Sequence, residues 1–190
     1  MAEDMTARFK FSDSINLIKN FKTTGTITPS SGNLVKRLLL PINFADARCI
    51  VELGPGNGCV TRELLKSMRK DSELLCLEVN NDFVGQLNKI QDSRLNIYNA
   101  CATSMRKILD ILDIREVDYI VSSLPLALMD DEVVENILFA VDSNLKKGGR
   151  FLQYQYSLAN YSDVKSLFRA VKIRFTLRNM PPAFVYECIK

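Results

Sequence analysis

Along this chain, short apolar runs alternate with longer segments in which apolar residues recur at helical spacing. Five runs after residue 46 have the length of buried strands, and they lie at 48–53, 73–78, 94–98, 117–122 and 149–156. Helical segments separate them at 59–70, 80–90, 103–112 and 130–145. A further helix at 161–170 precedes two more strands, at 171–177 and 183–189. This alternation predicts an α/β fold with a seven-stranded, mostly parallel sheet and helices on both faces.

The N-terminal part of the chain has a different pattern. Four apolar residues are spaced four, three and three positions apart: Phe11, Ile15, Ile18 and Phe21. This spacing forms one apolar stripe on a helix, and a second helix is predicted at 33–40. We predict an amphipathic helical cap over 1–45 and a larger domain over 46–190. The stripe can pack on that domain or, with neighbouring lysines, enter a membrane interface, and the sequence leaves both open.

Composition restricts the chemistry. The 190 residues include no histidine, which excludes Ser-His-Asp and Cys-His catalysis and the usual zinc sites, so no metal is expected. The five cysteines form no C-x-x-C pair, as expected for reduced thiols in the cytosol. The chain has no apolar run of 18 residues, and its acidic start does not resemble a signal peptide. We therefore expect a cytoplasmic protein.

Charge is distributed unevenly. Residues 1–40 hold 6 basic and 3 acidic side chains, and residues 160–190 hold 6 and 2. Residues 41–159 hold 13 and 17. Basic ends suit an anionic partner such as a membrane surface or nucleic acid, although an ordinary solvated surface has the same composition.

The first predicted strand runs into three alternate glycines. Residues 50–58 are IVELGPGNG, so an acid, Glu52, precedes Gly54, Gly56 and Gly58. A dinucleotide-binding G-x-G-x-x-G motif would need glycine at 59, where the chain has Cys59. The pattern resembles motif I of the class I S-adenosylmethionine (SAM) methyltransferases, which have a Rossmann-like fold. We expect SAM as cofactor, bound against this loop and Asn57. Its α-amino group would donate to Glu52, directly or through water, and its carboxylate would lie at the start of the next helix.

The ends of the second and third strands suggest further SAM contacts. Glu78 lies twenty residues after Gly58, where nucleotide-binding folds place an acid that accepts both ribose hydroxyls. Val79 follows it. Cys101 and Ala102 end the third strand, at the position where methyltransferases commonly place an adenine-binding Asp. Since a thiol is a poor acceptor, adenine recognition falls to backbone groups or to Asn99.

The fourth strand ends in Ser122, Ser123, Leu124 and Pro125. In amino-methylating members of the fold, a polar-polar-Leu-Pro turn of this kind lies beside the transferred methyl group. Enzymes that methylate nucleobases typically have an aromatic residue next, but this chain has Leu126, so the clamp for a flipped base is missing.

A narrower resemblance extends nearly from end to end. The segments that carry it are 25–31, 52–58, 122–125, 153–156 and 178–183. They resemble the bacterial phospholipid N-methyltransferases, which methylate phosphatidylethanolamine. The resemblance implies that the N-terminal helix contacts the bilayer, that Ser30 and Ser31 lie near SAM, and that Tyr156 and Arg178 face the lipid headgroup. From the residues alone, Tyr156 could equally be sheet core, and Arg178 could brace the following prolines.

We therefore expect methyl transfer from SAM to the amine of a phospholipid such as phosphatidylethanolamine, with S-adenosylhomocysteine as product. The partners expected are the lipid and, through the N-terminal helix, an anionic surface on the inner face of the membrane. Nucleic acid is not expected. Three alternatives stay open: an rRNA adenine N6-dimethyltransferase-like enzyme, a methyltransferase for a soluble amine or another aminolipid such as an ornithine lipid, and a non-catalytic SAM-binding protein. The general base, the number of methyl groups and the oligomeric state stay open too.

Overall fold

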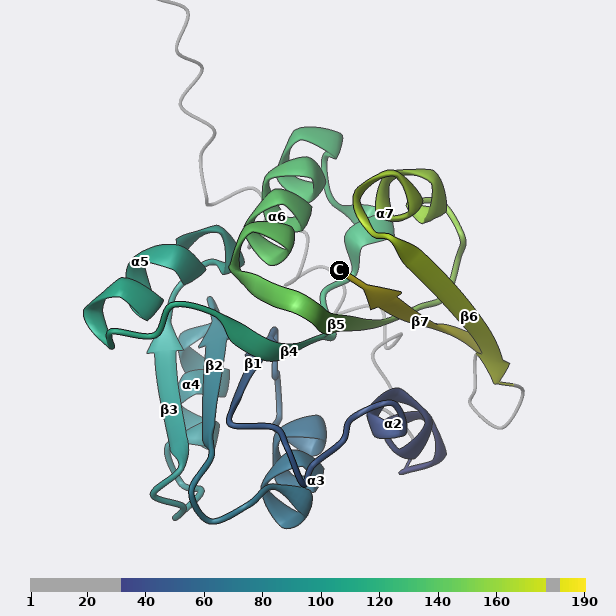
Figure 1. Cartoon of the computed structure of the whole chain (residues 1–190). Helices are drawn as coiled ribbons and strands as arrows, with labels where there is room; N and C mark the ends of the chain where they lie inside the picture. Colours follow the sequence, from purple (N-terminus) through teal and green to yellow (C-terminus); the bar gives the residue numbers. More distant parts are fainter. Residues whose placement is uncertain (1–31, 177–181) are drawn as a thin grey trace, which may run out of the picture.

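The computed structural model describes residues 32–176 and 182–190, which form one seven-stranded sheet covered by helices on both faces (Figure 1). Its order is β3-β2-β1-β4-β5-β7-β6. The strands are β1 (Cys49–Leu53), β2 (Glu73–Glu78), β3 (Leu95–Asn99), β4 (Val117–Ser122), β5 (Leu145–Gln155), β6 (Ala170–Thr176) and β7 (Ala183–Ile189). The first five strands are parallel, and β7 is antiparallel to both β5 and β6. The predicted α/β fold with a mostly parallel sheet is confirmed.

Helices form a layer on each side of the sheet. The helices are α2 (Gly32–Leu39), α3 (Cys59–Ser67), α4 (Asn81–Leu87), α5 (Met105–Ile111), α6 (Asp131–Asn144) and α7 (Tyr161–Leu167), with 3-10 turns η1 (Ala102–Ser104) and η2 (Leu126–Leu128). Apolar residues of α5, α6 and α7 pack in one core cluster, and those of α2 and α3 pack in the other. Among the described residues, no helix is long and apolar enough to cross a membrane.

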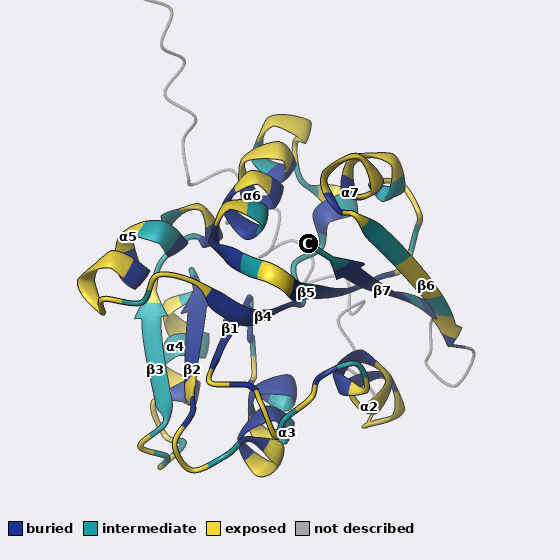
Figure 2. Cartoon of the chain, in the orientation of Figure 1, coloured by how far each residue is buried: buried dark blue, intermediate teal, exposed yellow. Residues whose placement is uncertain are grey.

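The inner strands are buried on both faces, as expected for a parallel sheet between two helical layers. All five residues of β1 are buried (Figure 2). Val51 and Leu53 belong to the cluster of α5, α6 and α7, whereas Ile50 belongs to the cluster of α2 and α3. At the sheet edge, β6 is largely exposed or intermediate.

The predicted helix at 33–40 is α2, and it belongs to the core of the sheet domain. Leu34, Val35, Leu38 and Leu39 are buried against the α2 and α3 face of the sheet. The apolar stripe predicted at Phe11–Phe21 lies outside the described residues. The division of the chain at residue 45 stays a prediction.

Candidate active site

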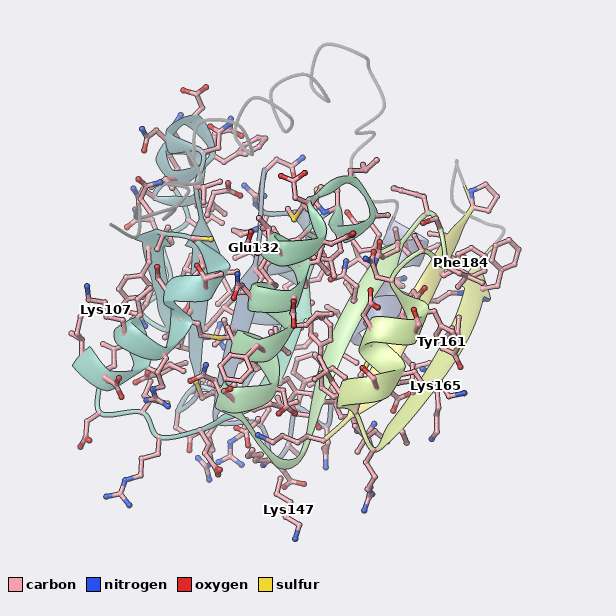
Figure 3. The ribbon with its side chains drawn as sticks, turned by 90° about the horizontal axis from the view of Figure 1, so that it is seen from above. Lys107, Glu132, Lys147, Tyr161, Lys165 and Phe184 are labelled. Atoms are coloured by element: carbon pink, nitrogen blue, oxygen red, sulfur yellow. The ribbon has the colours of Figure 1, made fainter. Side chains whose placement is uncertain are left out.

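The predicted site residues that the structure describes gather at one edge of the sheet. This edge is formed by the carboxyl ends of the five parallel strands, and in Figure 3 it lies on the side of Glu132 and opposite Lys147. The strand order reverses between β1 and β4, and ligands of open α/β sheets bind at such a switch point. Ser30, Ser31 and Arg178 lie outside the described residues, so their predicted roles stay predictions.

The glycine loop between β1 and α3 has the backbone that its spacing predicts. Gly54, Gly56 and Gly58 have φ values of 68°, 55° and 79°, in the left-handed region that glycine adopts without strain. A Cβ on Gly54 would lie 2.7 Å from Leu124 Cδ2, whereas a Cβ on Gly56 would meet only Phe83, at 4.0 Å. The glycine loop is therefore tightly packed at Gly54 against the loop that follows β4, which we call the β4 loop. At Gly56 the glycine loop has room for a ligand.

Asn57 and Glu78 hold this loop. The Asn57 Oδ1 atom accepts from the Cys59 backbone N–H at 3.2 Å, at the start of α3. The Glu78 carboxylate, at the end of β2, accepts from the Gly56 N–H at 3.0 Å through one oxygen and from the Asn80 N–H at 2.9 Å through the other. Since a carboxylate oxygen can accept two hydrogen bonds, each oxygen retains one site. Glu78 can therefore support the loop and still bind two hydroxyl groups.

Glu52 lies beneath the loop and not on its surface. Its side chain is fully buried, and Cys76 on the neighbouring strand donates to its Oε2 atom at an Sγ–O distance of 3.4 Å. Its Oε1 atom is buried without a hydrogen-bond partner among the described residues. Burial raises the pKa of Glu52 to about 7, although Thr61 and Cys76 act in the opposite direction. The predicted contact of Glu52 with the SAM amino group, directly or through water, stays a prediction.

The end of β3 is close to the place predicted for adenine. Cys101 is half-buried, and its carbonyl accepts from the Ser104 N–H at 2.9 Å in η1. Ala102 is buried in the core. The Asn99 amide donates to the Glu78 carbonyl at 3.0 Å, so its nitrogen joins the ends of β2 and β3. Val79 is half-buried beside them.

The β4 loop is shaped by its own first serine. Ser122 is fully buried, and its hydroxyl accepts from the Leu124 N–H at 3.2 Å. The Ser123 N–H donates to the Leu53 carbonyl at 3.0 Å, which ties this loop to the end of β1. Ser123, Leu124 and Pro125 are partly exposed. Ser122 therefore acts as a structural acceptor, and Ser123 has the more accessible hydroxyl.

Two buried glutamines of β5, which the sequence did not identify as site residues, brace this loop. Gln153 Nε2 donates to the Leu124 carbonyl at 2.8 Å and to the Tyr154 carbonyl at 2.9 Å. Gln155 Oε1 accepts from the Ala127 N–H at 3.2 Å. We call Gln153 and Gln155 the glutamine brace. Polar residues at alternate positions of an otherwise apolar strand were the available signal.

Tyr156 follows the end of β5 and is not sheet core. Its side chain is 44% exposed, and its ring stands edge-on to Tyr154, with centroids 6.0 Å apart at 77°. The location at the carboxyl edge is compatible with contact to a substrate. That contact stays a prediction.

Comparisons with known proteins support the methyltransferase interpretation. No family model matches the chain. It is 28% identical over 173 residues, 90% of each chain, to the ornithine lipid N-methyltransferase of Singulisphaera acidiphila. Its structure is similar to 1,6-didemethyltoxoflavin-N1-methyltransferase of Burkholderia thailandensis, with a TM-score of 0.67, 10% identity and coverage of 94% and 86% of the two chains. It is also similar to precorrin-6y C5,15-methyltransferase of Geobacter metallireducens, with a TM-score of 0.65, 17% identity and coverage of 83% and 89%.

These matches test several predictions. The Rossmann-like methyltransferase fold is confirmed by the structural matches. The resemblance to lipid N-methyltransferases and the enzyme class, a methyltransferase, are confirmed by the curated relative. SAM as cofactor agrees with the S-adenosylhomocysteine bound to the Burkholderia enzyme.

Proposed function

We propose that this protein transfers a methyl group from SAM to the amine of an aminolipid, such as an ornithine lipid or phosphatidylethanolamine. The observation that carries the proposal is the convergence of two loops at the switch point, the glycine loop against Leu124, in a chain that matches a lipid N-methyltransferase over 90% of its length. The loops support a SAM-dependent reaction, and the relative supports the acceptor class.

The glycine loop fits the cofactor. Gly56 leaves open space beside the backbone, and the N–H groups at the start of α3 would bind the carboxylate of SAM. The free acceptor sites of Glu78 would receive the ribose hydroxyls, and backbone groups near Cys101 and Ala102 would bind adenine. When bound, SAM supplies a methyl group whose bond to sulfur breaks as the amine nitrogen bonds to the carbon, with the electron pair going to sulfur and one proton leaving nitrogen.

The β4 loop would hold the acceptor amine. The Leu124 carbonyl already accepts from Gln153 and from the Leu126 N–H, at 2.8 and 2.9 Å, so both of its acceptor sites are filled. The Ser123 hydroxyl and the Tyr156 hydroxyl are the side-chain groups we assign to the amine. Either can orient a neutral nitrogen and pass its proton to water. Fixed alignment of this kind can supply about 7–11 kcal/mol of a barrier.

A membrane surface is part of this proposal. A lipid acceptor resides in a bilayer, so the enzyme must reach it there. We propose that the apolar stripe containing Phe11 and Ile18 contacts the membrane on its cytoplasmic side. Replacing both residues with Asp should weaken binding to anionic vesicles while leaving SAM affinity unchanged. Unchanged vesicle binding would exclude this role for the stripe.

Methylation of nucleobases has less support. Leu126 stands where adenine-methylating enzymes have an aromatic clamp, and it is fully buried in the core. The residue therefore neither stacks on a base nor lines an open site.

The test is a transfer assay with labelled SAM. Dispersed ornithine lipid, dispersed phosphatidylethanolamine, a soluble primary amine and ribosomal RNA are offered in parallel, and SAM affinity is measured by calorimetry. We expect label in an aminolipid, and mass spectrometry of the extract identifies the acceptor and the number of methyl groups. SAM binding without any labelled lipid would refute the proposed function.

A further inference from the structure

The edge strand β6 exposes apolar side chains on one face and cations on the other. Its register aligns Ile173 with Tyr186 and Phe175 with Phe184, and this face is the one covered by α6 and α7. Lys172 and Arg174 point to the opposite face, where β6 pairs with Glu187 and Val185 of β7. Ile173 is 36% exposed and Phe175 is 48% exposed.

The aromatic residues lie at the same edge of the sheet as the candidate active site. Gln155 pairs with Phe184, and Phe184 pairs with Phe175, so one row of the sheet connects the glutamine brace to these two rings. The Phe175 and Phe184 rings contact each other with centroids 4.9 Å apart. Figure 3 shows Phe184 on the side away from Lys147, as expected for the carboxyl edge.

A cation of α2 lies beside Phe175. Arg37 of α2 donates to the Phe175 carbonyl at 3.4 Å, and it forms no ion pair within the described part of the chain. Arg174 is 2.8 Å from Glu187, an Nη1–Oε2 ion pair on the buried side of the strand. Arg174 is thereby paired, and it lies on the other face of β6 from the rings. We call Phe175, Phe184 and Arg37 the β6–β7 corner. It combines two rings at the sheet edge, of which Phe175 is 48% exposed, with an exposed guanidinium group.

We propose that the β6–β7 corner docks on a bilayer that contains anionic lipid. The rings would enter the boundary between headgroups and acyl chains, and the Arg37 guanidinium would pair with lipid phosphate. Charge complementarity selects the bilayer over an apolar protein partner, because the Arg37 cation is bonded to the backbone of Phe175. The inference rests on the proposed function, which places the acceptor in a membrane. The corner would turn the sheet edge that carries the candidate active site toward the lipid, and it would do so independently of the N-terminal stripe.

The test uses the full chain and vesicles of phosphatidylcholine and phosphatidylglycerol in equal parts. Phe175→Asp places a charge in the ring pair, and Arg37→Glu reverses a charge at an exposed position, where folding is not at stake. Matched controls are Ile111→Asp and Lys107→Glu, both in α5 at the opposite end of the sheet (Figure 1); Ile111 is 78% exposed. Vesicle affinity is measured by co-sedimentation at low and high salt.

We expect Phe175→Asp to weaken vesicle binding about tenfold and Arg37→Glu about fivefold or more at low salt, with the second effect lost at high salt. The controls should stay within about twofold, and SAM affinity should be unchanged in every variant. Wild-type affinity in both corner variants, equal losses in the controls, or no vesicle binding by the wild-type protein would overturn the proposal. Methylation of detergent-dispersed aminolipid is assayed alongside. If the vesicle results overturn the docking surface but the wild-type protein methylates the dispersed lipid, the docking surface alone is wrong. If the wild-type protein methylates no lipid, the proposed function itself fails.

Discussion

Gly54 and Leu124 are packed so closely that a Cβ on the glycine would lie 2.7 Å from the leucine Cδ2 atom. The contact joins the loop that follows β1 to the loop that follows β4, at the point where the strand order reverses. The Ser123 N–H, bonded to the Leu53 carbonyl, ties the same loops through their backbones. The proposed cofactor and acceptor positions are therefore mechanically coupled, and a change in one loop is expected to displace the other.

Gly54→Ala should damage both stability and SAM binding. Its φ of 68° costs about 1–2 kcal/mol for a residue with a Cβ, and the new methyl group would push Leu124 away. We expect at least about a tenfold loss of SAM affinity, measured by calorimetry.

The matched control for Gly54→Ala is Gly85→Ala in α4, where a Cβ meets nothing within 4 Å. Alanine in place of this helical glycine should stabilise the protein by about 0.5–1 kcal/mol and leave SAM affinity unchanged. If the two substitutions behave alike, the packing of the glycine loop is not what matters for the ligand.

Glu78→Ala should weaken SAM binding by about tenfold or more. The variant removes the acceptors for the ribose hydroxyls, and it also releases the Gly56 N–H that the carboxylate holds at 3.0 Å. Glu73→Ala, at the opposite end of the same strand, serves as the control. Unchanged SAM affinity in Glu78→Ala would show that the ribose is bound elsewhere.

Gln153→Leu should lower kcat while SAM affinity stays near that of the wild type. The substitution removes the donor to the Leu124 carbonyl, which is 2.8 Å from Nε2, so only the Gln155–Ala127 hydrogen bond of the glutamine brace remains. Because misplacement near the reacting atoms can cost about a hundredfold, we expect a decrease in kcat between about tenfold and a hundredfold. The rate is expressed per SAM-binding site, which separates it from misfolding. A lower melting temperature with an unchanged kcat would assign the glutamine brace to stability alone.

The sheet and the glycine loop were predictable because each follows from local constraints. Inner strands of a parallel sheet must be apolar on both faces, which makes β1, β2 and β4 recognisable from their composition. The spacing of Gly54, Gly56 and Gly58 reflects three left-handed residues in alternation. The start of β5 was less predictable: the structure begins it at Leu145, not at 149, because Leu145 already pairs with Val117 of β4.

The roles of Glu52, Gln153 and Gln155 depended on which elements become neighbours. Nothing near Gln153 in the sequence indicates that β5 lies beside β4, yet that pairing brings its amide to Leu124. Glu52 was predicted to reach the ligand because it precedes the glycines. The alternation of β1 turns its side chain to the α3 side of the sheet, where Cys76 donates to it, and its contact with the ligand stays a prediction.

Burial of Glu52 predicts a specific dependence of stability on pH. Its pKa is about 7 in the folded protein, above the ordinary value of 4.5, so between these values the folded state holds a proton that the unfolded state has released. Stability should therefore fall as pH rises from about 4.5 to 7 and stay lower above 7, by about 3 kcal/mol at most.

Glu52→Gln removes the titration. Relative to the wild type, the variant should gain stability between about pH 5 and pH 8, measured as the difference in unfolding free energy from denaturant titrations at the two pH values. The change in unfolding free energy between the two pH values is taken for each protein separately. Any pH-independent effect of the glutamine side chain on stability then cancels. A difference that does not change with pH would mean that Glu52 is ionised in the folded protein and that the buried carboxylate is compensated by a partner.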